Sequence, residues 1–174
     1  MINDVARTFF EAGMKRTVCV ELPMEANTGV HEREQAVGPL KLSLYGTRDA
    51  AANFQEEVKK FMEKFEFEQS KYNPSMYFNR KRNIRTLVHG DDFVSSLSRP
   101  AAKWFKEKLE QRFEIKTKII GAGHGEYREE RALNRVIRVT NDGWEYEADQ
   151  RHKRNHHQEL GHGGGQGCAN TRGR

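Results

Sequence analysis

Three aspartates have the type and spacing to hold divalent cations for phosphoryl-transfer chemistry. Asp91 and Asp92 are adjacent in a Gly-Asp-Asp turn between two apolar, β-prone runs, in residues 85–94 (RTLVHGDDFV). This pattern predicts a β-hairpin with paired carboxylates at its tip. The third aspartate, Asp4, lies in a short β-prone run near the start of the sequence. On a strand beside the hairpin, Asp4 would complete a set of carboxylates able to hold two cations about 3.5–4 Å apart.

A plainer interpretation of the same turn stays open. Adjacent acids in a tight turn repel each other unless water or a cation screens them, and most Gly-Asp-Asp turns are simply solvated. It is Asp4 that favours a metal site over a solvated turn.

The composition favours one soluble domain with a polar working surface. The 174 residues are 36% hydrophobic and 32% charged, enough for one core and hardly for two. No run approaches the roughly 18 apolar residues of a membrane helix, and the N-terminal residues lack a signal-peptide layout. We therefore expect an intracellular protein, cytoplasmic or nuclear, that is not secreted and has no membrane partner.

The charge and the metal-binding residue types are unevenly distributed. Residues 1–150 hold 25 Lys and Arg against 24 Asp and Glu, whereas residues 151–174 hold five against one. The net charge of +5 thus belongs mostly to the tail and is weak evidence for nucleic-acid binding. Cys19 and Cys168 lie in different contexts, so no disulfide framework is expected. His152 and His156, four residues apart, have no third ligand at zinc spacing.

The hydrophobic pattern predicts the elements that position these residues. A short strand carries Asp4, and two further strands are predicted over residues 17–22 and 39–45, separated by a polar loop over 24–37. The remaining pattern predicts a helix over 48–66, paired strands over 75–97, a helix over 100–113 and a strand over 114–120. A further hairpin is predicted from residues 132–139 and 143–147.

Both helices are amphipathic in this pattern. The first has Asp49 as a candidate N-cap and the second has Pro100 in its first turn. Apolar residues recur at helical spacing and should face a core: Phe54, Val58, Phe61, Met62 and Phe65 in the first helix, and Ala101, Phe105, Leu109 and Phe113 in and after the second.

The element order is βαββαβ, which predicts an α+β fold with an antiparallel sheet covered by helices on one face, a ferredoxin-like arrangement. Residues 1–148 are expected to form this domain. A short helical connection is expected over 149–160, and the Gly-rich residues 161–174 lack an apolar period and should be disordered.

Six stretches in order resemble the reverse transcriptase of copia-type LTR retrotransposons, between Asp4 and about Leu160. In the family, the first is an Asp-Val palm motif and the fourth is Tyr-Val-Asp-Asp. The stretches are residues 4–9 (DVARTF), 18–23 (VCVELP), 44–50 (LYGTRDA), 89–92 (HGDD), 113–116 (FEIK) and 148–152 (ADQRH).

The resemblance implies the palm of an RNA-directed DNA polymerase that uses Mg²⁺ or Mn²⁺. Asp4 and Asp91 would be the principal metal ligands and Asp92 the auxiliary one. Three residues would contact the nucleotide: Phe9 as the aromatic that crowds a ribose 2′-hydroxyl, Gly46 through close backbone approach, and Lys116 at the triphosphate. Phe9 and Lys116 also have plainer interpretations, as a core aromatic and a solvated strand lysine, and Gly46 as a strand-ending turn.

The resemblance also implies partners: an RNA template, a DNA primer, deoxynucleotide triphosphates and the remainder of a Pol polyprotein. Basic side chains that could contact the nucleic acid are Arg48 and the run Arg80, Lys81 and Arg82. The run has an alternative interpretation as a solvated hairpin loop.

Departures from the family pattern keep other functions open. His89 and Gly90 replace Tyr and Val; Thr8, Asp49 and Ala51 depart from the other motifs. The family's fingers region would precede Asp4, so these 174 residues alone are expected to be inactive. One alternative is a degenerate, non-catalytic palm remnant that binds nucleic acid. The other is a metal-dependent phosphohydrolase that uses the same carboxylates.

Overall fold

The computed structural model describes residues 1–23, 25 and 37–147, and the protein has a mixed α+β fold. The chain divides into two compact units, Met1–Ile119 and Ile120–Arg174. The predicted segments 149–160 and 161–174, with His152, His156 and Cys168, lie outside the described residues. Within the described part of the chain, no helix is both long and apolar enough to cross a membrane.

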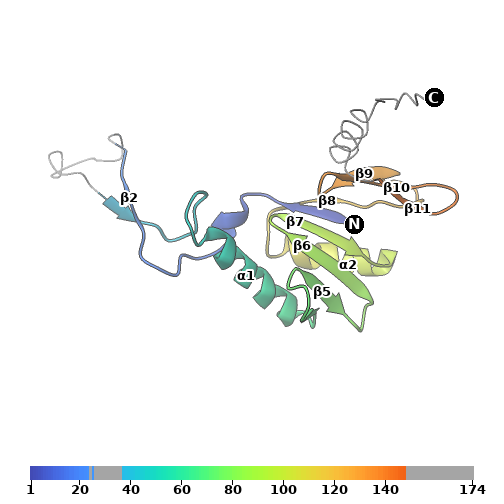
Figure 1. Cartoon of the computed structure of the whole chain (residues 1–174), viewed down its shortest axis with the longest axis horizontal. Coiled ribbons are helices and arrows are strands. Elements are labelled where there is room, and N and C mark those ends of the chain that lie inside the picture. The colour runs from blue at the N-terminus through green and yellow to red at the C-terminus, as the bar shows by residue number, and fades with distance from the viewer. Residues whose placement is uncertain (24, 26–36, 148–174) are drawn as a thin grey trace, which may run out of the picture. The chain divides into compact units, whose positions relative to one another are not determined.

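The first unit is built on a six-stranded sheet in which all paired strands are antiparallel (Figure 1). Its strand order is β4-β5-β6-β7-β1-β8, so the short β1 lies between the β6–β7 hairpin and β8. Four residues are enough for β1 because both of its edges are paired. The strands are β1 (Ile2–Val5), β4 (Glu68–Gln69), β5 (Met76–Asn79), β6 (Ile84–His89), β7 (Asp92–Ser96) and β8 (Ile115–Lys118).

One face of this sheet carries the core. Side chains alternate along each strand, and Val5, Ile84 and Phe93 point to the face covered by helices α1 (Ala50–Lys64) and α2 (Arg99–Glu110). The two predicted apolar stripes are confirmed: all their members are buried except Phe65, which is partly buried against the same core. Phe113 joins the layers, since its ring lies 5.2 Å from that of Phe61 and 6.3 Å from that of Phe93.

The ends of the helices differ in part from the prediction. Asp49 occupies the N-cap position of α1 but makes no capping hydrogen bond, because its carboxylate pairs with Arg16. Pro100 lies in the first turn of α2, as its fixed φ and missing N–H favour.

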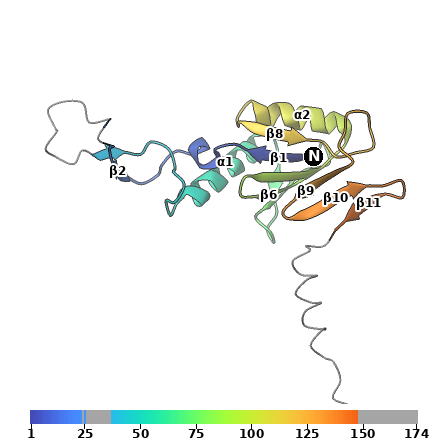
Figure 2. The same cartoon turned by 90° about the horizontal axis from the view of Figure 1, so that it is seen from above.

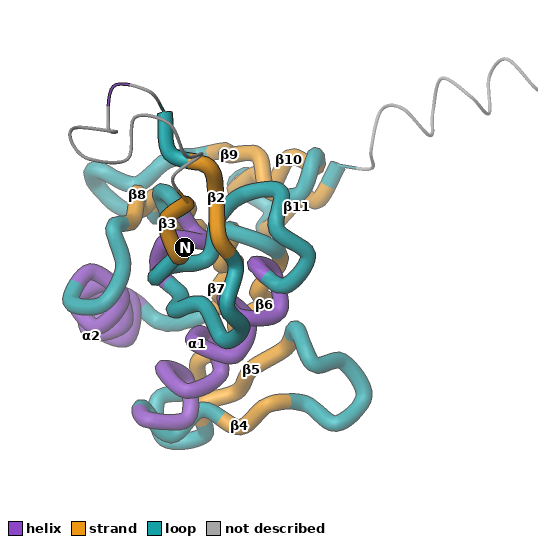
Figure 3. The backbone as a smooth tube through the Cα atoms, turned by 90° about the vertical axis from the view of Figure 1, so that its left-hand side faces the viewer, coloured by secondary structure: helices purple, strands orange, loops and turns teal. Residues whose placement is uncertain are grey.

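A separate two-stranded ribbon of β2 (Cys19–Glu21) and β3 (Val37–Pro39) follows a short 3-10 helix, η1 (Thr8–Glu11) (Figure 3). The predicted strand over residues 39–45 is wrong, because β3 ends at Pro39. Residues 40–45 meet residues 12–18 through scattered backbone bonds, such as Ser43 N–H to Ala12 O at 2.8 Å, and one isolated bridge. They do not form a continuous ladder.

The described residues of the second unit form a three-stranded antiparallel sheet, β11-β10-β9 (Figure 2). The strands are β9 (Glu129–Ala132), β10 (Arg135–Val139) and β11 (Trp144–Tyr146). The predicted hairpin is confirmed in β10 and β11. However, the predicted strand over 132–139 is interrupted by a turn in which Leu133 and Asn134 have φ values of 50° and 63°. The strand before that turn, β9, was not predicted.

Candidate functional site

Four side chains form a row across four adjacent strands, on the sheet face opposite the helices. His89 of β6 pairs with Asp92 of β7, Asp92 pairs with Asp4 of β1, and Asp4 pairs with Lys116 of β8. Directly opposite residues of antiparallel strands point to the same face, with Cβ atoms about 4.5–5.5 Å apart. The row therefore places two carboxylates side by side, with a histidine on one flank and a lysine on the other.

The hairpin turn holds the third aspartate close to the same strand. Because His89 pairs with Asp92, only Gly90 and Asp91 form the loop, and Gly90 has a φ of 61°. A positive φ at the first of two loop residues suits a tight hairpin and explains the glycine. The Asp91 carbonyl accepts a hydrogen bond from the Val5 N–H at 3.0 Å, so this exposed residue is tied to the end of β1.

The carboxylates of this site repel one another. Partial burial raises the pKa of Asp92 above its ordinary value of 3.8, and the neighbouring carboxylates of Asp91 and Asp4 raise it further, while His89 lowers it. Ionised Asp92 is therefore disfavoured by the fold, and a bound cation would relieve the repulsion.

The donors suit a hard divalent cation in type, although they are not gathered into a three-ligand group. Mg²⁺ prefers carboxylate oxygens, and Asp4 and Asp92 face the same side of neighbouring strands. Among the described residues, no three His, Cys, Asp or Glu side chains stand together as a set that could hold a metal ion. Two facing carboxylates with a third one in the adjoining turn are thus what the fold supplies.

The raised pKa of Asp92 predicts a pH-dependent gain in stability from Asp92→Asn. The ionised carboxylate costs stability above the folded-state pKa, and this cost disappears below about pH 3.8, where the folded and unfolded forms are both protonated. Without added metal, the variant should be more stable than the parent chain at pH 7, and the difference should shrink as the pH falls towards 4. Urea unfolding followed by circular dichroism measures both values. Glu107→Gln, at an exposed position of α2, is the matched control and should show no such trend.

Of the three residues predicted to contact the nucleotide, Lys116 lies beside the carboxylates, whereas Phe9 and Gly46 lie near each other through Tyr45. Lys116 is in the row beside Asp4. Phe9, on η1, has its ring 4.5 Å from that of Tyr45, which directly precedes Gly46. Gly46 has a φ of 88°, and an added Cβ would meet no atom within 4 Å, so the backbone conformation is what favours glycine here. Sequence reasoning missed Tyr45, although it lies in the LYG stretch.

An arginine two residues after α2 holds η1 in place. Arg112 donates to the Glu11 carboxylate and to the Glu11 carbonyl, each at 2.8 Å, and reaches the Glu57 carboxylate of α1 at 3.5 Å. Arg112 thus joins both helices to the short element that carries Phe9.

The predicted basic contacts are not brought to the carboxylates. Arg80, Lys81 and Arg82 form the loop between β5 and β6, at the opposite end of β6 from Gly90, and six residues of strand span about 17–20 Å. Arg80 pairs with Glu68, Lys81 pairs with Glu66, and the Arg82 guanidinium lies 4.0 Å from the centroid of the Trp104 ring. Arg48 is exposed, two residues before α1 begins.

The family model described as "Reverse transcriptase (RNA-dependent DNA polymerase)" matches residues 2–121. This range covers more than half of the chain and includes the three aspartates and every other predicted site residue. Comparisons with curated proteins and with solved structures found no match.

Proposed function

The chain belongs to the reverse transcriptase family, and from this premise we propose that it is the palm of an RNA-directed DNA polymerase from a copia-type retrotransposon. The Leu-Tyr-Gly run at residues 44–46 supports the copia type, and Asp91 and Asp92 stand where the family has its paired aspartates. The order β6-β7-β1-β8, with both helices packed on one face, supports a ferredoxin-like palm. In this proposal the chain works as part of a larger Pol polyprotein.

One observation carries the proposal: the register that sets Asp4 opposite Asp92, with Asp91 in the turn between β6 and β7. Asp4 and the Gly-Asp-Asp turn are far apart in the sequence, and pairing of β1 with β7 brings them together. This arrangement favours two-metal nucleotidyl transfer over the alternative that the Gly-Asp-Asp turn is merely solvated. A solvated turn gives no reason for a third acid on the neighbouring strand.

Each residue then has a role set by its place. Asp4, Asp91 and Asp92 would hold Mg²⁺ or Mn²⁺, which when bound stabilises charge on the attacking and leaving oxygens. Lys116, beside Asp4, offers its ammonium group to the triphosphate of the incoming deoxynucleotide. Phe9 and Gly46, joined through Tyr45, shape the pocket for the sugar and exclude a ribose 2′-hydroxyl.

The nucleic-acid contacts are proposed at two places. Arg48 would contact the RNA template at the start of α1. Arg80, Lys81 and Arg82 would contact the duplex of template and primer away from the carboxylates, through phosphates alone. Because each residue of the loop already has a partner, these contacts require an exchange of partners.

Metal binding tests the proposal directly. We expect the folded chain to bind Mn²⁺, and we expect the double variant Asp4→Asn, Asp91→Asn to bind at least about tenfold more weakly, since even losing a group that orients a metal ligand costs about that much. The measurement is the relaxation enhancement of the water signal during a Mn²⁺ titration. Glu107→Gln with Glu110→Gln, on the exposed surface of α2, also removes two negative charges and should change nothing.

The single variants rank the carboxylates. Asp91→Asn should weaken Mn²⁺ binding more than Asp92→Asn if Asp91 is the principal ligand and Asp92 the auxiliary one, as the family resemblance implies. Equal losses, or a larger loss for Asp92, which pairs with Asp4 across the strands, would reject that ranking. An unchanged enhancement in the double variant would place the metal elsewhere. A parent chain that binds no Mn²⁺ at all would favour the degenerate, non-catalytic palm remnant.

A further inference from the structure

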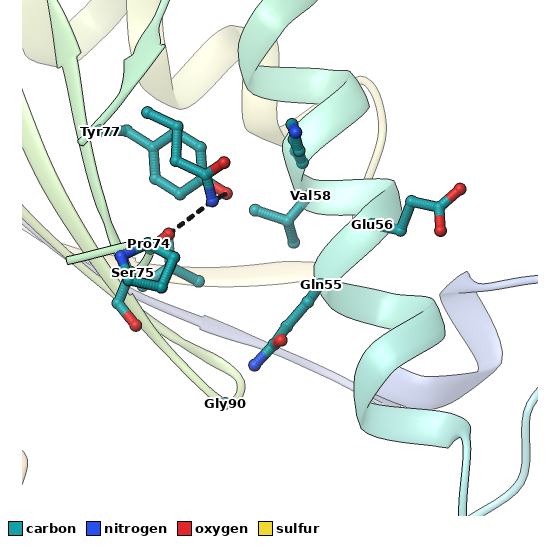
Figure 4. Close-up of a pocket in the computed structure, with 10 residues that line it drawn as sticks. Gln55, Glu56, Val58, Pro74, Ser75, Tyr77 and Gly90 are labelled. Carbon is teal, nitrogen blue, oxygen red and sulfur yellow. Dashed lines mark hydrogen bonds between the residues drawn. The ribbon is translucent and has the colours of Figure 1, made fainter. Parts of the chain in front are cut away.

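A cavity of about 430 Å³ lies between helix α1 and strands β4, β5 and β6, and it reaches the Gly90 turn (Figure 4). Its volume is in the range of small-molecule sites, about 300–1,000 Å³. The lining residues that matter for its chemistry are Gln55, Val58, Gln69, Ser75, Tyr77 and Gly90.

The cavity combines an apolar wall with hydrogen-bonding groups that the protein leaves unused. Val58 is buried and projects from α1 towards the strands (Figure 4). Gln69 donates through Nε2 to the Pro74 carbonyl at 2.7 Å and to the Tyr77 hydroxyl at 3.2 Å. Its amide oxygen and the Tyr77 hydroxyl proton therefore remain available. Within the described part of the chain, the side chains of Gln55 and Ser75 make no hydrogen bond.

The charged residues of the lining are already neutralised. Glu56 pairs with Lys15 and with Lys60, and its carboxylate points away from the cavity (Figure 4). Lys59 lies 3.8 Å from the carboxylate of Glu63. A phosphate or carboxylate ligand would find no unpaired cation, so the lining favours an uncharged ligand.

We propose that this cavity binds an uncharged nucleobase, with adenine as the best match. A flat ring can lie against Pro74 and the partly buried Val88. The Gln55 amide can then form two hydrogen bonds with its edge, as glutamine does with adenine. Two glutamines, a serine and a tyrosine hydroxyl supply both donors and acceptors around that plane. The base could come from a free nucleoside or from an unpaired position of a nucleic-acid strand.

The position of Gly90 gives such binding a consequence. Gly90 is in the cavity wall, and it is also the first residue of the two-residue turn that carries Asp91. A base held in the cavity would restrict this turn. The inference is otherwise independent of metal binding, because no lining residue belongs to the row of His89, Asp92, Asp4 and Lys116.

Adenosine titrated into the ¹⁵N-labelled full chain tests the site. We expect saturable NMR shifts of the Gln55 and Gln69 side-chain amides and of the Gly90 backbone amide. Gln55→Leu should weaken binding by roughly 30-fold, because both hydrogen bonds of its amide to the base edge are lost. Gln111→Leu, at an exposed glutamine after α2, is the matched control and should not change it. Adenosine monophosphate should bind no more tightly than adenosine.

Two further experiments identify the source of the base and separate this inference from the proposed polymerase function. A four-residue oligodeoxyadenylate that shifts the same amides more strongly than adenosine would indicate an unpaired base of a strand; the reverse would indicate a free nucleoside. Asp4→Asn with Asp91→Asn should leave adenosine binding unchanged, so loss of the metal site would not affect this result. The absence of saturable shifts at the three amides would overturn the inference. So would adenosine binding by both Gln55→Leu and a second variant, Ser75→Ala, that is as tight as binding by the parent chain.

Discussion

Primer extension is expected to fall more than about 100-fold when Asp4 is replaced by asparagine. The proposed reaction needs a carboxylate at this position on β1, and a misplacement of only about 1 Å can already cost about 100-fold. Removing the negative charge altogether should cost at least as much. The effect should appear in kcat, because Asp4 would act on the reacting phosphate through the metal and not on binding of the template.

The assay uses an RNA template, a DNA primer, deoxynucleotide triphosphates and Mn²⁺. It should be run on the 174-residue chain and on the same chain joined to a copia-type fingers region before Met1. Asp142→Asn, at an exposed position of the second unit, is the matched control and should extend normally. Extension that survives Asp4→Asn in the joined protein would contradict the catalytic role of this residue. Extension by neither parent protein would favour the degenerate palm remnant.

The largest effect on stability is expected from Phe93→Ala, at about 3–5 kcal/mol of the free energy of unfolding. Phe93 is completely buried in β7, pairs with Asn3 of β1 and Val88 of β6, and contacts the Phe113 ring. Its removal leaves a cavity where both helices meet the central strands.

Urea unfolding followed by circular dichroism gives the value. Phe93→Leu keeps most of the volume and should cost clearly less. Tyr72→Ala also removes a large aromatic side chain, but Tyr72 is fully exposed and its loss should stay within about 0.5 kcal/mol. A loss for Phe93→Ala as small as that for Tyr72→Ala would show that the core does not depend on this ring.

The sequence predicts the positions of elements that have a long apolar repeat or that flank a recognisable turn. The two helices repeat apolar residues over three or more turns, and β6 and β7 flank a turn with recognisable chemistry, so these elements were predicted close to their observed bounds. Even the short β1 was located, because Asp4 sits within a β-prone run.

The apolar pattern does not predict elements whose structure depends on backbone hydrogen bonds to another segment. Residues 40–45 alternate like a strand, yet their partner segment offers no continuous row of backbone groups. Leu133 adopts a positive φ that a leucine rarely takes, so Asn134 is the single residue whose type indicates the turn that separates β9 from β10. Such positions are stabilised by neighbouring strands and not by their own residue type.

For the site, the sequence identified the three candidate carboxylates, and the strand register in the structure shows which of them lie side by side. The meeting of Asp4 and the Gly-Asp-Asp turn was a hypothesis from residue types, and its metal-binding role stays a prediction. In the sequence, His89 is only a departure from the family motif. Its place opposite Asp92 follows from the number of residues in the turn, which the apolar pattern alone does not fix.

The two-residue turn at Gly90 and Asp91 also determines how this site can be lost in evolution. Gaining or losing a single codon there could slip the β6–β7 pairing by one position, and a slip of one residue sends every side chain of a strand to the other face. Asp92 would then enter the core and Phe93 would face solvent. Point substitutions can erode the chemistry step by step while the fold persists, but a length change at this turn would remove the site and much of the core together. Related sequences that keep the turn length should therefore persist as folded proteins longer than those that do not.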